Sequence, residues 1–247
     1  MPVGLFSRRG APVLQTIGSA QFRREVRTAN ELLSALTQVL AFNRGAVAGQ
    51  PSGATIVLVG NITLPSPLII DTPVTLEGNG VLTLINDARV QLGSSLRGAS
   101  RITLRGFSVV ATDATAGTPV TVDNTNGATF VRMEDLDVTP LTTADTGISF
   151  TVDVGWMVNC RVAGDVTVDG VQNEITGLAA QSLNIIAGAN SNRVFGGRIA
   201  DFVILGSNNC RLVGVDVQGA GLGHRPEQRH CWQHGKRQRR GLERGRR

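Results

Sequence analysis

The chain has 247 residues, of which 41% are hydrophobic, 4% aromatic and 17% charged, and its formal net charge is +5. This apolar content and modest net charge exclude a disordered chain, and three cysteines exclude a disulfide-stabilised scaffold. No apolar run reaches the length of about 18 residues that a membrane-spanning helix needs. The chain is long enough to bury a sizeable core in one large domain or two small ones.

The positive charge lies at the two ends of the chain. Residues 1–30 carry a net charge of +4 and residues 224–247 carry +7, whereas residues 31–223 carry −6. An acidic central part does not favour nucleic-acid binding by that part. Binding of nucleic acid through the basic carboxyl-terminal tail is therefore the third and last of three functional hypotheses.

A leader and a helix are expected at the amino-terminal end. Residues 1–27 lack the apolar segment of a secretory signal peptide, and we expect them to form a loosely ordered leader. An amphipathic capping helix is expected over residues 28–46, because Thr28 and Glu31 have the spacing of a capping box. The apolar residues that follow recur with helical spacing: Leu32, Leu33, Leu36, Val39 and Leu40.

The body of the chain, residues 47–223, is a repeat of short strands. Runs of Val, Ile, Leu and Thr alternate with a turn residue that tolerates a positive φ: Gly78, Gly106, Asp135, Asn159, Gly177, Gly196 and Gly214. An apolar residue lies two positions before each turn residue, and another lies three positions after it, from Val81 to Val217. Leucine-rich repeats, propellers and sandwiches would need signatures that are missing. The pattern predicts a single-domain, all-β, single-stranded right-handed parallel β-helix with one coil per repeat.

Three segments of the sequence resemble the pectate-lyase-like family of right-handed β-helix proteins: residues 26–36, 54–62 and 73–78. The resemblance implies a short strand, a helix that covers the open end of the stack, and then the first coil. It also implies an extracellular, cell-surface or virion location, although no signal peptide is visible. Because this fold serves lyases, hydrolases, adhesins and viral tail spikes, the resemblance assigns no activity.

The acidic residues closest together in the body are the weak candidates for catalysis: Glu134, Asp135 and Asp137. If the protein were an active lyase, the resemblance would imply a Ca²⁺ ion held by clustered acids; otherwise no cofactor or metal is expected. Asp135 occupies a turn position, and Asp137 lies between two apolar residues, which is typical of solvated turn and surface acids. His and Lys are absent before residue 224, and so are the sequence motifs of pectin-cleaving hydrolases.

Arginines recur within a few residues of successive turns and are weak candidates for ligand binding: Arg105, Arg132 and Arg161, followed by Arg193 and Arg211. They could form an outward ridge that binds acidic sugars, or a solvated ridge that balances nearby acids. Trp156 could be a platform for a sugar, or it could be partly buried on a strand. We therefore expect a non-catalytic structural or surface-recognition protein of the bacterial-surface or phage-tail type, with surface glycan as its partner. The alternative is a polysaccharide lyase or glycoside hydrolase.

Two further residue types recur in the last coils. Asn173, Asn192 and Asn209 occur once per coil, which predicts a structural asparagine ladder. Cys160 and Cys210 fall at different phases of the repeat, so we expect two small buried side chains and no disulfide between them.

Residues 224–247 are expected to be a disordered basic tail, and two origins are open. One is a functional basic segment around Lys236. The other is a frameshift, because reading the gene one base later converts Trp232 before Gln233 into Gly, 18 residues after Gly214. The true stack would then be longer, and the truncated coil would be uncapped and prone to self-association. Sequencing the gene should reveal further Gly- and Asn-punctuated coils in the other frame; an early stop codon there would rule out the frameshift.

Overall fold

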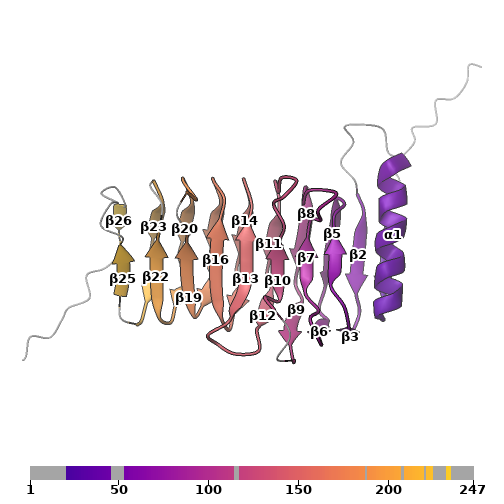
Figure 1. Cartoon of the computed structure of the whole chain (residues 1–247), viewed down its shortest axis with the longest axis horizontal. Helices are drawn as coiled ribbons and strands as arrows, with labels where there is room; N and C mark the ends of the chain where they lie inside the picture. Colours follow the sequence, from indigo (N-terminus) through magenta and orange to yellow (C-terminus); the bar gives the residue numbers. More distant parts are fainter. Residues whose placement is uncertain are drawn as a thin grey trace, which may run out of the picture.

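A computed structural model describes residues 21–45, 53–113, 117–186, 188–206, 209–219, 221–224 and 232–234. The chain forms a right-handed parallel β-helix, in which each coil passes in turn through three all-parallel sheets (Figure 1). Apart from the first two strands of the chain, which pair with each other, neighbours in a sheet are three strands apart in the sequence, because each strand pairs with the strands of the adjacent coils. The predicted fold class is confirmed.

The three sheets are named A, B and C in the order in which each coil visits them. Sheet A contains β1 (Arg23–Val26), β2 (Thr55–Leu58), β5 (Val74–Gly78), β8 (Ile102–Arg105), β11 (Arg132–Glu134), β14 (Trp156–Val158), β17 (Glu174–Thr176), β20 (Arg193–Phe195), β23 (Arg211–Val213) and β26 (Trp232–His234). Sheet B contains β3 (Asn61–Leu64), β6 (Val81–Leu84), β9 (Ser108–Ala111), β12 (Asp137–Thr139), β15 (Arg161–Val162), β18 (Ala179–Ala180), β21 (Arg198–Ile199) and β24 (Asp216–Val217). Sheet C contains β4 (Leu68–Ile70), β7 (Val90–Leu92), β10 (Val120–Val122), β13 (Thr146–Thr151), β16 (Asp165–Asp169), β19 (Ser182–Ile185), β22 (Phe202–Leu205) and β25 (Gly221–His224).

The only helix among the described residues, α1 (Ala29–Gly45), lies across the amino-terminal end of the stack (Figure 1). Its first turn is capped as expected, because the backbone N–H of Glu31 donates to Thr28 Oγ1 over 3.2 Å. The Glu31 carboxylate in turn accepts the backbone N–H of Arg27 over 2.7 Å. Leu32, Ala35, Leu36 and Val39 are buried against the first coil. No helix in the described part of the chain is long and apolar enough to cross a membrane.

Side chains that point inward stack in register to form one continuous core. In sheet A the inward positions are the apolar residues two places before each predicted turn, from Leu76 to Leu212, and all of them are buried. All seven predicted turn residues have a positive φ, between 50° and 152°. The turn at the end of each sheet A strand therefore needs a residue that tolerates this conformation, and the repeat pattern identified it.

Two residues that the sequence predicts to face the core, Val81 and Leu33, do not occupy the core positions; a neighbouring residue does. Val81 is half-buried and pairs with Ser108, whereas its neighbour Leu82 is buried and pairs with Val109. The cause is that the turn after β5 is one residue longer than the turn after β8. Three residues lie between Glu77 and Val81, whereas two lie between the equivalent residues of the next coil, Arg105 and Ser108. In α1, Leu33 is 46% exposed, and the smaller Ala35 takes the buried position.

The structure also differs from the expected chain ends. Arg23–Val26 was placed in a loosely ordered leader, but it forms β1, which pairs with β2 along its whole length. His224 and Trp232–His234 were placed in a disordered tail, but they lie in β25 and β26. The rest of the predicted leader and tail, including the basic cluster around Lys236, lies outside the described residues, and the frameshift hypothesis stays a prediction.

The inward register can be tested at Val194, which lies on β20 and is 1% exposed. Changing Val194→Asp should lower the free energy of unfolding by ~3–5 kcal/mol, because it buries an unpaired charge in the core. Its exposed neighbour supplies the control: Arg193→Ser should leave the stability within ~0.5 kcal/mol of wild type. Thermal and urea denaturation measure both, and an unchanged melting temperature for Val194→Asp would show that the register is wrong.

Candidate functional site

The outer face of sheet A carries the candidate site, and its side chains form two rows that run along the axis of the stack. The first outer row contains Thr55, Thr75, Thr103, Arg132, Trp156, Glu174, Arg193 and Arg211. The second outer row contains Val57, Glu77, Arg105, Glu134, Val158, Thr176, Phe195 and Val213. The first row changes from threonines to charged and aromatic residues at β11, which marks the second half of the stack as chemically distinct.

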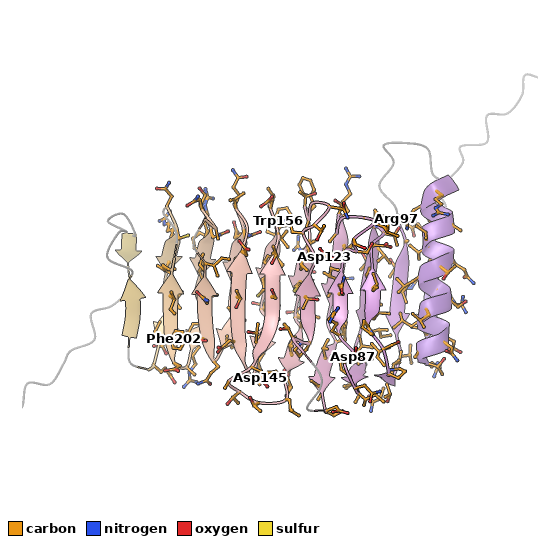
Figure 2. All side chains as sticks on the ribbon, viewed as in Figure 1. Asp87, Arg97, Asp123, Asp145, Trp156 and Phe202 are labelled. Atoms are coloured by element: carbon orange, nitrogen blue, oxygen red, sulfur yellow. The ribbon has the colours of Figure 1, made fainter. Side chains whose placement is uncertain are left out.

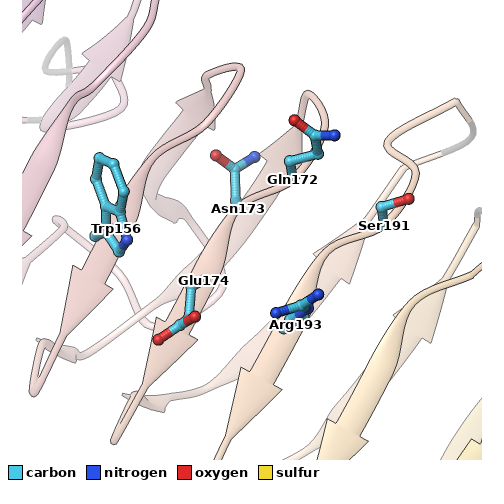
Figure 3. A pocket seen from close by; sticks show the side chains of 6 residues that line it. All are labelled: Trp156, Gln172, Asn173, Glu174, Ser191 and Arg193. Carbon is cyan, nitrogen blue, oxygen red and sulfur yellow. The ribbon is translucent and has the colours of Figure 1, made fainter.

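A hollow of about 420 Å³ lies on this face over β14, β17 and β20 (Figure 3). Its lining residues are Trp156, Gln172, Asn173, Glu174, Ser191 and Arg193. Trp156, Glu174 and Arg193 come from successive strands of the first outer row, while Gln172 and Ser191 come from the turns that lead into sheet A (Figure 3). The hollow therefore runs across the strands, parallel to the axis of the stack.

An aromatic pair borders the hollow. The rings of Phe130 and Trp156 stack with their centroids 6.2 Å apart and their planes 21° apart. Phe130 is 50% exposed, and Trp156 is half-buried. Both rings thus expose apolar surface beside the polar groups of the lining, which is the combination that sugar-binding and other small-ligand sites use.

The wall of the hollow is tied to the core by an asparagine ladder. Asn173, which is 1% exposed, accepts the backbone N–H of Gly155 over 2.7 Å and donates to the Val152 carbonyl over 2.7 Å. Its own backbone N–H donates to the side chain of Asn192 over 2.8 Å. The Asn192 amide donates to the carbonyls of Gly170 and Ala189. These bonds satisfy backbone groups that turn away from the sheet ladder, so the turns carrying Gln172 and Ser191 are held in place.

The asparagine ladder contains two of the three predicted residues, Asn173 and Asn192, but not Asn209. Cys210 directly precedes β23 as Asn192 directly precedes β20, and Asn209 lies in the turn before it with a φ of 60°. Cys160 and Cys210 are both buried, as expected, and no disulfide joins them; Cys160 follows a sheet A strand, whereas Cys210 precedes one. Burial raises the pKa of the Cys160 thiol to about 11, so this side chain is a neutral packing group at physiological pH.

Ion pairs neutralise the arginines in the first half of the sheet. Glu77 accepts hydrogen bonds from Arg105 and, over 2.8 Å, from Arg23, and these bonds hold the pKa of the Glu77 carboxyl below its usual range. The pKa of Arg105 is raised by the same contact. Arg132 pairs with Glu134 on its own strand. Two of the predicted ligand-binding residues, Arg105 and Arg132, are thus already engaged by carboxylates.

The three predicted acids do not form a cluster. Glu134 lies on the outer face of sheet A, Asp135 at the turn with a φ of 50°, and Asp137 on β12 of sheet B. Among the described residues, no group of three or more His, Cys, Asp or Glu side chains is placed to hold a metal ion.

The predicted arginine ridge divides between two faces. Arg132, Arg193 and Arg211 share the first outer row of sheet A, whereas Arg161 projects from β15 of sheet B. Sequence reasoning selected Trp156 but missed Phe130, Gln172, Glu174 and Ser191 in and beside the hollow. No sequence signal marked these residues: Phe130, Gln172 and Ser191 share a positive φ of 57°, 59° and 62°, which is visible only in the structure.

Comparisons of the chain with models of known protein families, with curated proteins and with solved structures gave no match.

The asparagine ladder gives a prediction for the stability of the site. Changing Asn192→Ala should lower the free energy of unfolding by ~2–4 kcal/mol, because it removes the acceptor of the Asn173 N–H and the donor to two carbonyls. The same change at half-buried Asn184, on the outer face of sheet C, should have an effect of less than ~1 kcal/mol. Urea denaturation measures both, and equal effects would mean that the ladder carries no special stability.

Proposed function

We propose that this protein is a non-catalytic recognition β-helix that binds a surface glycan along the outer face of sheet A. Its resemblance to pectate-lyase-like proteins makes it similar in kind to the β-helix proteins of bacterial surfaces and phage tails. The observation that carries the proposal is the exposed Phe130–Trp156 pair at the edge of a polar hollow. Sugar rings have an apolar face and a polar rim, and such a site presents a partner for each.

The composition of the hollow supports binding to a glycan. Gln172 and Ser191 are exposed in the lining of the hollow, where each can donate hydrogen bonds to hydroxyl groups or accept hydrogen bonds from them. Glu174 is an acceptor and Arg193 a donor for the same purpose. The lining is carried by parallel strands that the asparagine ladder fixes to the core, so little of the binding free energy would be spent on ordering the site.

Cleavage of the glycan has less support than binding. Hydrolysis of a glycosidic bond generally uses two carboxyl groups on either side of the bond. Among the described residues that line the hollow, Glu174 is the only carboxylic acid. The nearest predicted catalytic acid on the same sheet, Glu134, is paired with Arg132. We therefore place recognition first and a lyase or hydrolase activity second.

The proposal predicts that glycan binding depends on the aromatic pair. On a glycan array the full-length protein should bind a subset of polysaccharides. Calorimetry on these ligands should show about tenfold weaker binding, near 1.4 kcal/mol, for Trp156→Leu and for Phe130→Leu. Phe202→Leu, which makes the same change on β22 of sheet C (Figure 2), should bind as wild type does.

Two results would contradict the proposal. The first is equal affinity of the Trp156→Leu, Phe130→Leu and Phe202→Leu proteins, provided that circular dichroism shows all three to be folded. The second is catalytic turnover. If reducing ends or unsaturated uronates form from any bound polysaccharide, the protein is an enzyme and the non-catalytic function is wrong.

A further inference from the structure

Building on the proposed function, we infer that the glycan bound along sheet A is one in which acidic and neutral sugars alternate. Arg193 and Arg211 together bind the acidic group of one sugar. Glu174 faces the preceding sugar, which carries no acidic group. The inference rests on the order of charges in the first outer row beyond Trp156: one carboxylate followed by two guanidinium groups.

Arg193 and Arg211 form a pair of adjacent cationic side chains on the outer face of sheet A, and Glu174 is the neighbour of Arg193 in register. They lie directly opposite each other on β20 and β23, about 4.8 Å apart along the sheet, and both are exposed. Like charges at opposed positions of neighbouring strands destabilise a sheet. Among the ion pairs between described residues, none involves either arginine, whereas Arg23, Arg105 and Arg132 each contact a glutamate. An anionic ligand would supply the missing charge, since two guanidinium groups can hold the oxygens of one anion through charge-assisted hydrogen bonds.

Glu174 imposes the opposite preference one strand earlier. It is half-buried on β17, between Trp156 and Arg193, and it lines the hollow (Figure 3). No ion pair among the described residues engages its carboxylate, even though Arg193 is its neighbour in register. An acidic sugar placed against Glu174 would meet a like charge at short range, where the partly buried position weakens screening by water.

The spacing of these charged residues determines which sugars of a bound glycan they would contact. Successive positions of the first outer row are one strand apart, about 4.8 Å. This step is close to the length of one sugar unit in an extended chain, so a glycan lying in the hollow would place consecutive sugars over consecutive strands. The ligand then needs a neutral sugar over β17 and, over β20, an acidic sugar whose charged group reaches both Arg193 and Arg211. A homopolymer of uronic acids fails at Glu174, and a neutral glycan leaves the arginine pair uncompensated.

Calorimetry with the full-length protein and defined oligosaccharides tests this inference. Octasaccharides of hyaluronan and of unsulfated chondroitin alternate acidic and neutral sugars, oligogalacturonate carries an acid on every sugar, and maltooctaose carries none. We expect at least one of the two alternating octasaccharides to bind about tenfold more tightly than both oligogalacturonate and maltooctaose. Its affinity should fall as salt is raised, because the contact is electrostatic.

Substitutions at Arg193, Arg211 and Glu174 test whether these residues cause the preference for the alternating glycan. Arg193→Gln and Arg211→Gln should each weaken binding of the alternating octasaccharide about tenfold. Glu174→Gln should tighten oligogalacturonate binding by about threefold or more without weakening the alternating ligand. Matched controls lie on sheet B: Arg198→Gln and Asp216→Asn make the same charge changes there and should leave every affinity unchanged.

The outcomes separate this inference from the proposed function. If oligogalacturonate or maltooctaose binds as tightly as both alternating ligands, or if Arg193→Gln and Arg211→Gln bind with wild-type affinity, the inference is wrong. In that case binding that still depends on Trp156 keeps the recognition function. If neither the array nor the defined oligosaccharides show binding, the proposed function fails, and the inference fails with it.

Discussion

The structure depends on one constraint, the in-register stacking of inward side chains from coil to coil. Each sheet A strand from β5 to β23 places at least one apolar residue in the core, from Leu76 through Met133 to Leu212, and the next coil places another directly beside it. A parallel pairing with no shift is needed to keep these residues together, because a slip of one position would turn every side chain to the opposite face. The turn that follows sheet A protects this register by using residues that accept a positive φ, such as Asp135 and Asn159.

Because the core fixes only the inward positions, the outward positions of the same strands can vary without loss of fold. The first outer row uses this freedom: Thr75 and Thr103 occupy the positions that Trp156, Glu174 and Arg193 occupy further along. Outer side chains on adjacent strands are held about one strand spacing apart, so a change of residue becomes a change of surface chemistry at a fixed distance. A stack of this kind presents a linear array of groups, which suits a linear polymer as its ligand.

The features that repeat in the sequence could be predicted, and the features that break the repeat could not. The turn residues and most inward residues follow from spacing alone, because each coil must solve the same steric problem. Val81 was misplaced since the first turn holds an extra residue, and this insertion leaves the local pattern of apolar residues unchanged. The hollow was missed for a related reason: Phe130, Gln172 and Ser191 share a positive φ but no chemical similarity, so they form no visible motif.

The asparagine ladder links this structural constraint to the candidate site. Its amides bond to backbone groups inside the turns, and the same turns carry the residues that line the hollow. The ladder consists of Asn173 and Asn192, and in the next coil Cys210 is the residue that directly precedes the sheet A strand. The coils whose outer face carries the hollow are therefore the coils whose turns are braced from within. A site built in this way, on paired strands and bonded turns, keeps its geometry before any ligand arrives, and that preorganisation favours recognition of a chain by the spacing of its groups.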